Sequence, residues 1–225
     1  MITFFTAIGT YKFGTNERGQ NAPYIQSLGK LHAISIPEFV IWSHLLWDIL
    51  TYEELKEKYA AQLKKVNAPV PDFDELIEML LARKLIARGQ AYTGSDALYS
   101  MLSEAFVLPH KPSLFKHRSG LSACLNDARE YLMNLFPNKH ESAASYESRV
   151  FALIKQTPLS VSELSRCLDL GLSDVSSPDK LIAGIYGTSD QAHISVEQQN
   201  SPNRNTVLQA ISNLYLHHKV FLELA

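Results

Sequence analysis

The chain has few of the sequence features that mark small secreted proteins or proteins that coat nucleic acid. Its 225 residues include two cysteines, Cys124 and Cys167, whose separation fits neither a disulfide framework nor a zinc site. The formal net charge is −2 and the pI is near 6.4, so contact with nucleic acid would require a local basic patch. The scarcity of cysteine indicates a reducing compartment.

Targeting and membrane-spanning segments are also missing. Residues 1–14 are apolar but have no basic region and no small-residue cleavage site, so we expect no signal peptide. The longest apolar stretch, residues 39–50, is interrupted by Ser43, His44 and Asp48 and is too short to span a bilayer. We therefore expect a soluble, cytoplasmic protein that has no membrane partner.

Motifs of the common enzyme classes do not occur. The chain has no glycine-rich nucleotide loop, no His-Glu-x-x-His zinc motif and no Gly-x-Ser-x-Gly nucleophile motif. Its eight histidines are scattered, and the neighbours His217 and His218 would point in different directions on a helix. We expect no enzyme, no cofactor and no metal site, and an active site assembled only in the fold is the weakest alternative.

The chain does contain enough apolar material for real cores, since 46% of its residues are hydrophobic and 20% are charged. Residues 1–34 are rich in aromatic and β-branched residues and contain turn signals, which predicts a β-hairpin packed on a helical unit. Four aromatic residues of this segment would either cover a core, which is the favoured interpretation, or form a dimer surface. They are Phe4, Phe5, Tyr11 and Phe13.

A first helical unit is predicted over residues 35–108. Ser35 with Glu38, and Thr51 with Glu54, form two capping boxes that open helices. A third helix follows residue 72, and residues 85–96 are expected to form a strand pair around a glycine-containing turn. Apolar residues recur at helical spacing and are expected to be buried. They are Phe39, Trp42, Leu45, Leu46, Ile49, Leu55, Tyr59, Leu63, Phe73, Leu76, Ile77, Leu80 and Leu81.

This order of elements resembles the winged helix-turn-helix family. The resemblance covers residues 35–95 and rests on a helix, a Thr-x-x-Glu-Leu helix at 51–55, a longer helix, and the segment 83–89 that leads to a wing. It implies DNA binding, in which the third helix enters the major groove and the wing touches the phosphate backbone.

Residues 109–140 are expected to connect two units. A helix over 96–108 comes first, then a basic loop that contains proline, and then an amphipathic helix over 121–136. The loop is the densest positive stretch of the chain, and it is either a solvated linker or a phosphate contact. Its charged residues are Lys111, Lys116 and Arg118.

The final segment, residues 141–225, repeats the helical pattern of the first unit with an insertion at 169–200. Ser160 and Glu163 form the capping box of its second helix. The favoured third helix follows residue 203, with Val207, Ile211, Leu214 and Tyr215 inward, and the chain ends after one exit strand. In the alternative, residues 178–186 form the third helix and 187–200 the wing. The predicted fold is thus mainly α, of the α+β type, with tandem winged helix-turn-helix units, an N-terminal β-hairpin and a helical connector.

The charges on the two third helices differ. The first begins with four carboxylates, which DNA would repel, while its basic residues lie only at its far end, so a scaffold or dimerisation role is favoured. The carboxylates belong to Asp72, Asp74, Glu75 and Glu78, and the basic residues are Arg83, Lys84 and Arg88. The second helix carries polar side chains suited to base edges and phosphates, with no carboxylate from Ser201 to Lys219.

The leading hypothesis is a dimeric, DNA-binding transcription regulator. Its second unit would read double-stranded DNA, and its first unit would organise a homo-oligomer or bind a protein partner. The alternative is a tandem winged-helix scaffold for protein–protein contact that binds no nucleic acid. The expected DNA-contacting residues are Asn203, Arg204, Asn205, Thr206, Gln209, Asn213 and Lys219, together with Lys111, Lys116 and Arg118.

Overall fold

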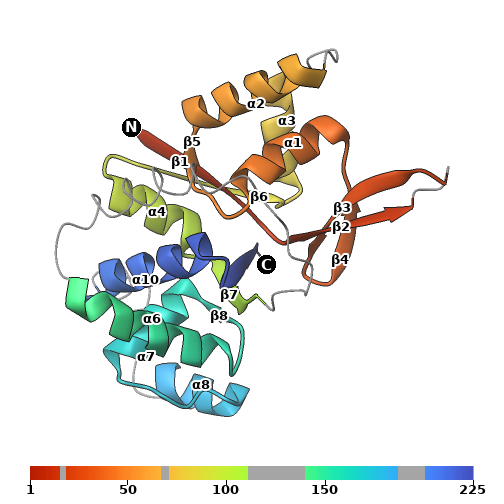
Figure 1. Ribbon diagram of the computed structural model, residues 1–225. Helices are drawn as coiled ribbons and strands as arrows, with labels where there is room; N and C mark the ends of the chain where they lie inside the picture. Colours follow the sequence, from red (N-terminus) through yellow and green to blue (C-terminus); the bar gives the residue numbers. More distant parts are fainter. Residues whose placement is uncertain (16–18, 67–70, 111–139, 187–200, 225) are drawn as a thin grey trace. The chain divides into compact units, whose positions relative to one another are not determined.

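The structure, a computed structural model, describes residues 1–15, 19–66, 71–110, 140–186 and 201–224. The chain divides into two compact units, one made of Met1–Leu102 with Phe221–Ala225 and the other of Ser103–Val220. The described residues form helices and three small three-stranded sheets, so the fold is α+β (Figure 1).

The N-terminal strand is the centre of the first sheet. β1 (Ile2–Ala7) lies between β5 (Leu50–Thr51) and β6 (Ile86–Ala91) and is antiparallel to both. Phe4 and Phe5 are buried, as the sequence predicts. The N-terminal segment therefore completes the sheet of the first unit and is more than a hairpin laid on its surface.

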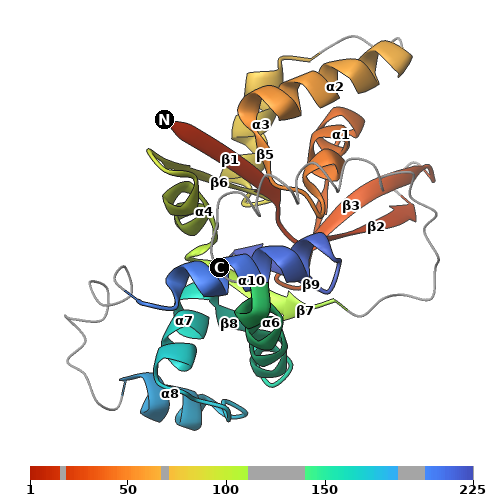
Figure 2. The same cartoon turned by 60° about the vertical axis from the view of Figure 1, so that its left-hand side comes forward.

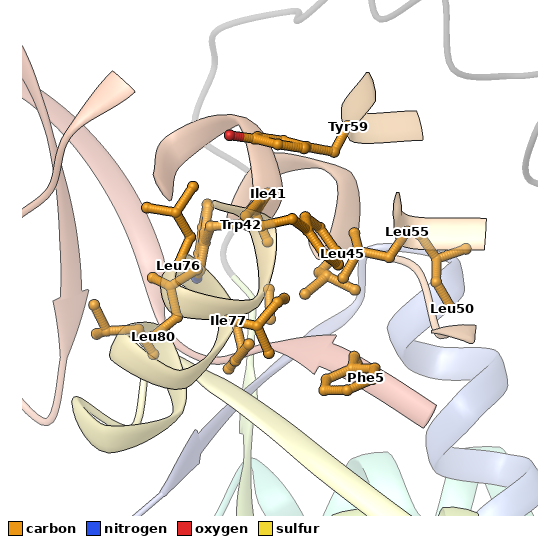
Figure 3. Packing of buried hydrophobic residues seen from close by; sticks show 14 of the residues in the cluster. Phe5, Ile41, Trp42, Leu45, Leu50, Leu55, Tyr59, Leu76, Ile77 and Leu80 are labelled. Carbon is orange, nitrogen blue, oxygen red and sulfur yellow. The ribbon is translucent and has the colours of Figure 1, made fainter. Parts of the chain in front are cut away.

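Three helices cover the core of this unit. They are α1 (Ile36–Leu45), α2 (Tyr52–Val66) and α3 (Phe73–Ala82). Trp42 of α1 is fully buried, and its Nε1 donates a hydrogen bond to the Ile8 carbonyl at 3.1 Å. Figure 3 shows side chains of the three helices in one cluster with Phe5 of β1 and Leu50 of β5. Most residues of the predicted apolar stripes are buried, while Phe39, Leu46 and Leu81 are partly buried at the edge of the cluster.

A second sheet follows β1. It contains β2 (Thr10–Thr15), β3 (Asn21–Ser27) and β4 (Lys30–Ala33) in that order, with antiparallel neighbours. In Figure 1 the β2–β3 hairpin extends away from the helices of the first unit. Residues 1–34 thus supply four strands in two sheets, where the sequence predicted one hairpin.

The strand pair expected over residues 85–96 is absent. β6 is a single strand, and Gly94 begins helix α4 (Gly94–Leu102). This helix packs closely on β6, because a Cβ atom at Gly89 would lie only 2.1 Å from the Ala97 carbonyl oxygen. The apolar residues between positions 97 and 102 are the face of α4 that packs on β6. The Tyr-Thr-Gly sequence, which was expected to form a turn between two strands, leads into this helix.

The second unit begins with a strand where the sequence predicted helix. β7 (Ala105–Pro109) replaces the last part of the helix expected over 96–108, which ends at Leu102. The helices of this unit and the strands that pair with β7 are visible in Figure 2. They are α6 (His140–Ile154), β8 (Leu159–Ser160), α7 (Val161–Asp169), α8 (Pro178–Tyr186), α10 (Arg204–Leu216) and β9 (Val220–Leu224), and the strand order is β8-β7-β9.

The two sheets that contain β1 and β7 have the same construction. Each has a central strand that precedes the first described helix of its unit, a two-residue strand before the next described helix, and a strand that follows a later helix. The register is also the same: in each sheet two residues of the central strand pair with the two residues of the short strand. Phe4 pairs with Thr51 and Phe5 with Leu50, whereas Phe106 pairs with Ser160 and Val107 with Leu159.

The predicted capping boxes lie at equivalent places in this repeat. The Thr51 amide donates to Glu54 Oε2 at 2.8 Å, and the Glu54 amide donates to Thr51 Oγ1 at 3.4 Å. The corresponding distances for Ser160 and Glu163 are 2.7 and 3.2 Å. Each box satisfies amides at the start of a helix that follows a short strand directly. All three predicted capping boxes are confirmed, including Ser35 with Glu38.

The helix exits match as well. Lys84 after α3 and His218 after α10 both have left-handed backbones, with φ of 54° and 58°. The amide of the next residue donates to the fourth carbonyl before that left-handed residue in both turns, from Leu85 to Leu80 at 2.9 Å and from Lys219 to Leu214 at 2.8 Å. α10 therefore ends in the same turn as α3, and α8 lies between α7 and α10; the assignment of α10 as the third helix of a winged-helix unit stays a prediction.

Candidate functional site

Helix α10, which was predicted to read DNA, is preceded by a residue whose side chain is hydrogen-bonded within the protein. Asn203 precedes the helix, and its side-chain oxygen accepts a hydrogen bond from the Tyr146 hydroxyl at 3.1 Å. Its side-chain nitrogen donates to Asp169 Oδ1 at 2.8 Å. Asn203 therefore connects α6, the end of α7 and the start of α10, and its amide is engaged before any ligand arrives.

Asn213, within α10, also donates to a carboxylate of another helix. Asn213 is half-buried, and its side-chain nitrogen donates to Glu147 Oε1 on α6 at 2.8 Å. Glu147 and Asp169 thus place carboxylates beside a helix whose own sequence contains none. A phosphate backbone approaching these two asparagines would meet negative charge. Sequence reasoning missed this because both carboxylates come from other helices.

More of α10 is buried than its sequence pattern predicts. Val207, Ile211, Leu214 and Tyr215 are buried as expected. Four further residues are also buried, so the interior covers more than one side of the helix. They are Leu208, Ala210, Ser212 and Leu216.

Part of the predicted DNA-contacting set does reach the surface. Asn205 and Lys219 are exposed, while Arg204, Thr206 and Gln209 are half-buried. Lys111, Lys116 and Arg118 lie outside the described residues, so the contact predicted for them stays a prediction.

The four carboxylates at the start of α3 are all exposed, and three of them have identifiable partners. Asp72 is the N-cap of α3 and accepts from the Asp74 amide at 2.9 Å. Asp74 accepts a hydrogen bond from the Tyr52 hydroxyl at 2.5 Å, which raises the pKa of that tyrosine. The helix start is therefore an acidic surface, as the sequence indicates, and it also stabilises α3.

The arginines at the far end of α3 are paired within the first unit. Arg83 Nη1 lies 2.9 Å from Glu38 Oε1, and its Nη2 donates to the Ala33 carbonyl. Arg88 Nη1 lies 3.2 Å from Glu78 Oε1. Both guanidinium groups thus have carboxylate partners, and the Glu38 carboxylate is buried. The sequence did not show the first pair because its members are separated by 45 positions.

A buried carboxylate that the sequence did not single out lies between α1 and β5. Asp48 accepts a hydrogen bond from the Ile49 amide at 2.9 Å and forms an ion pair with Lys58 of α2 at 3.1 Å. Burial raises the pKa of the Asp48 carboxyl, and Lys58 opposes that rise. The pair connects the helix exit with α2, so its role is structural.

An aromatic cluster joins strand β2 of the second sheet to helix α1. Tyr11 and Phe13 of β2 each contact Phe39 of α1, with ring centroids 6.0 and 5.7 Å apart. Tyr11 also contacts the buried Trp42 at 6.1 Å. Phe13 itself is 63% exposed, although the sequence favoured a core position for it. The prediction of a core position is wrong because it used hydrophobicity alone. The Phe13 ring packs on Phe39, while most of its surface is exposed to solvent.

Comparisons with known proteins identify no relative: no family model matches the chain, and no curated protein or solved structure is similar to it. Within the described residues, no three His, Cys, Asp or Glu side chains are grouped to hold a metal ion. In that same part of the chain, no helix has both the length and the apolar character needed to cross a bilayer. The candidate functional surfaces are therefore the partly exposed side of α10, the acidic start of α3 and the aromatic cluster between β2 and α1.

Proposed function

We propose that this protein is a protein–protein interaction scaffold built from two winged-helix-like units, and that it does not read DNA. The observation that carries the proposal is the pairing of the polar side chains. Asn203 and Asn213 on α10 are hydrogen-bonded to carboxylates, and Arg83 and Arg88 beyond α3 are in ion pairs. Groups engaged by carboxylates of the same protein are poor ligands for a polyanion.

The winged-helix part of the proposal is supported by the order of elements in each unit. Each of the two sheets combines a short strand before one helix with a strand after a later helix, an order similar to that family, and β9 closes the sheet of β7 and β8 although residues 221–224 belong to the first compact unit. The units depart from the family pattern in two respects. The central strands β1 and β7 precede the first described helix of their units, and β6 is followed by α4 where a wing would return. A first unit without a wing has fewer contacts to offer a DNA backbone.

DNA binding by the second unit is the other candidate. It is favoured by the exposed Asn205 and Lys219 and by the half-buried Gln209, which remain accessible in part. Asparagine and glutamine can pair with adenine, and lysine with phosphate. This surface is smaller than the one expected from sequence, because Asn203 and Asn213 are removed from it.

A titration against random-sequence duplex separates the two functions. Fluorescence anisotropy of a labelled duplex should show no saturable binding by the full chain, at low or at moderate salt. Binding at low salt that weakens steeply as salt rises would contradict the proposal, since that dependence reports phosphate contacts. In that case Gln209→Ala and Asn205→Ala should both reduce the affinity.

A site-specific cross-link tests the interaction role directly. A photoreactive phenylalanine analogue at position 13 should give one dominant protein adduct in the cells that make the protein, and the adduct should survive nuclease treatment. The matched control is the same analogue at Tyr92, which is 88% exposed and lies outside the aromatic cluster. Equal labelling from both positions would indicate random encounter and would count against the proposal.

A further inference from the structure

Strand β2 has one paired edge and one open edge. All six of its residues pair with β3, and β2 is the terminal strand of its sheet. Among the described residues, no strand pairs with its other side. Such an edge presents a row of backbone donors and acceptors to which an extended peptide can add as a further strand.

The side chains of β2 give the two faces of this edge different chemistry. Tyr11 and Phe13 lie on one face and contact Phe39 of α1, while Lys12 lies between them in sequence and therefore on the other face. Phe13 contacts the rings of Tyr11 and Phe39 and is nevertheless largely exposed, so its ring offers an apolar surface on the strand that has the open edge.

The charge on this sheet has one sign. Lys12 and Lys30 are exposed, and neither forms an ion pair among the described residues. The sequences of β2, β3 and β4 contain no Asp or Glu. A partner strand lying beside β2 would therefore be favoured if it placed carboxylates on the Lys12 face.

We propose that the open edge of β2 binds an extended segment of a partner protein in which apolar and acidic residues alternate. The apolar residues would pack on Phe13 and Tyr11, the acidic residues would face Lys12, and backbone hydrogen bonds would hold the register. This inference rests on the proposed scaffold function and identifies the kind of partner that the first unit takes.

The opposite edge of the same sheet is a poorer site and supplies matched controls. β4 has four residues, and very short edge strands offer little backbone for pairing. It carries Leu31, which is 60% exposed and so resembles Phe13 in exposure, and Lys30, which is exposed like Lys12. Changes at these two positions alter the surface to the same degree without touching β2.

The probe is a fluorescein-labelled synthetic peptide of sequence Ser-Glu-Val-Asp-Ile-Glu-Val-Asp-Ile-Ser, titrated into the full chain. We expect saturable binding that falls about tenfold with Phe13→Ser and about tenfold with Lys12→Glu. Leu31→Ser and Lys30→Glu should leave the affinity within about twofold. A peptide of the same composition with its acidic and apolar residues in separate blocks should bind at least about tenfold more weakly.

Backbone pairing is tested with N-methylated peptides. Methyl groups on alternate amides remove the hydrogen bonds of one peptide edge and keep every side chain, so one of the two alternate sets should reduce binding at least about tenfold. The proposal would be overturned if both N-methylated sets bound as tightly as the unmodified peptide, or if the block peptide bound as tightly as the alternating one. It would also be overturned if the β4 variants weakened binding and the β2 variants did not. A dimer in sedimentation that Phe13→Ser dissociates would also overturn it, since the occupant would then be a second copy of the chain.

These outcomes are distinguishable from failure of the scaffold function. If the peptide does not bind and duplex DNA does not bind, the β2 site alone is wrong. Salt-sensitive duplex binding would instead contradict the scaffold function on which the site rests.

Discussion

Helices α3 and α10 lie at the same place in two copies of one arrangement, yet they present different surfaces. At the start of α3, Asp74 and Glu78 are exposed, whereas the equivalent residues of α10, Leu208 and Ser212, are buried. The capping boxes, registers and exit turns of the two units agree residue by residue. A repeated backbone arrangement thus leaves the surface of its third helix free to vary, because the backbone bonds that define the repeat do not involve those side chains.

The largest expected effect concerns the strand after each third helix. Gly89 of β6 has no room for a Cβ under α4, while the residue at the equivalent place in β9 is Glu223. Gly89→Ala should therefore lower the free energy of unfolding by about 3 kcal/mol or more, through overpacking against backbone. Chemical denaturation measures the loss.

The matched variant is Glu223→Ala, for which we expect a loss of no more than about 1 kcal/mol. Equal losses at the two positions would mean that α4 does not make the first unit different from the second at this strand.

The next effect tests the charge pair that only the first unit has. Asp48 and Lys58 correspond to Thr157 and Cys167, so the second unit has uncharged residues at these places. Lys58→Met should cost about 1–3 kcal/mol at neutral pH, because it leaves a buried carboxylate unpaired. Denaturant unfolding at several pH values gives the measurement.

The sign of the pH dependence follows from the raised pKa of Asp48. A folded state that holds this proton more tightly than the unfolded chain gains stability as the pH falls through the raised pKa. The loss in Lys58→Met should therefore shrink in acid, and adding Asp48→Asn should remove most of it at neutral pH. A loss that is the same at every pH would point to lost packing of the lysine stem.

A smaller pair of effects tests whether the two capping boxes are equivalent. Thr51→Ala and Ser160→Ala should each reduce stability by about 1 kcal/mol, since each removes the acceptor for a helix-start amide. Differential scanning calorimetry of the two variants gives the comparison. Stability losses that differ by more than about 1 kcal/mol would show that the two capping boxes are not energetically equivalent, although their hydrogen bonds match.

The smallest expected effect is at the surface ion pair between Arg88 and Glu78. Both side chains are more than 45% exposed, so Glu78→Gln should change stability by less than about 0.5 kcal/mol. Thermal unfolding at low and high salt measures it, and a salt-independent loss above 1 kcal/mol would contradict the assignment of a solvent-screened pair.

Much of the helical architecture was predictable from local pattern. The capping boxes at Ser35, Thr51 and Ser160 each combine a hydroxyl residue with a glutamate three positions later, and such bonds form within one turn. The buried stripes of α2 and α3 were equally visible. The strands were harder, because β7 is a short apolar run that continues the periodicity of the preceding helix.

The candidate site was less predictable than the helices. Asn205 and Lys219 reach the surface as their sequence positions indicate, but the side-chain nitrogens of Asn203 and Asn213 donate to carboxylates of the same protein. Their partners come from α6 and α7, so the sequence of α10 contains no sign of them. Phe13 was misplaced for a related reason, since the sequence shows neither its contact with Phe39 of α1 nor that its ring is 63% exposed.

The sequence by itself determined where the helices that open with capping boxes begin, which apolar residues form the buried stripes of α2 and α3, and that the capping pattern recurs. These depend on hydrogen bonds within a turn and on the period of apolar residues, and both are local. The tertiary structure decided that β1 and β7 are the central strands, that carboxylates lie beside the asparagines of α10, and that β2 has an open edge. Each of these depends on which distant segments meet, and strand pairing and ion pairing between distant residues leave no periodic trace in a single chain.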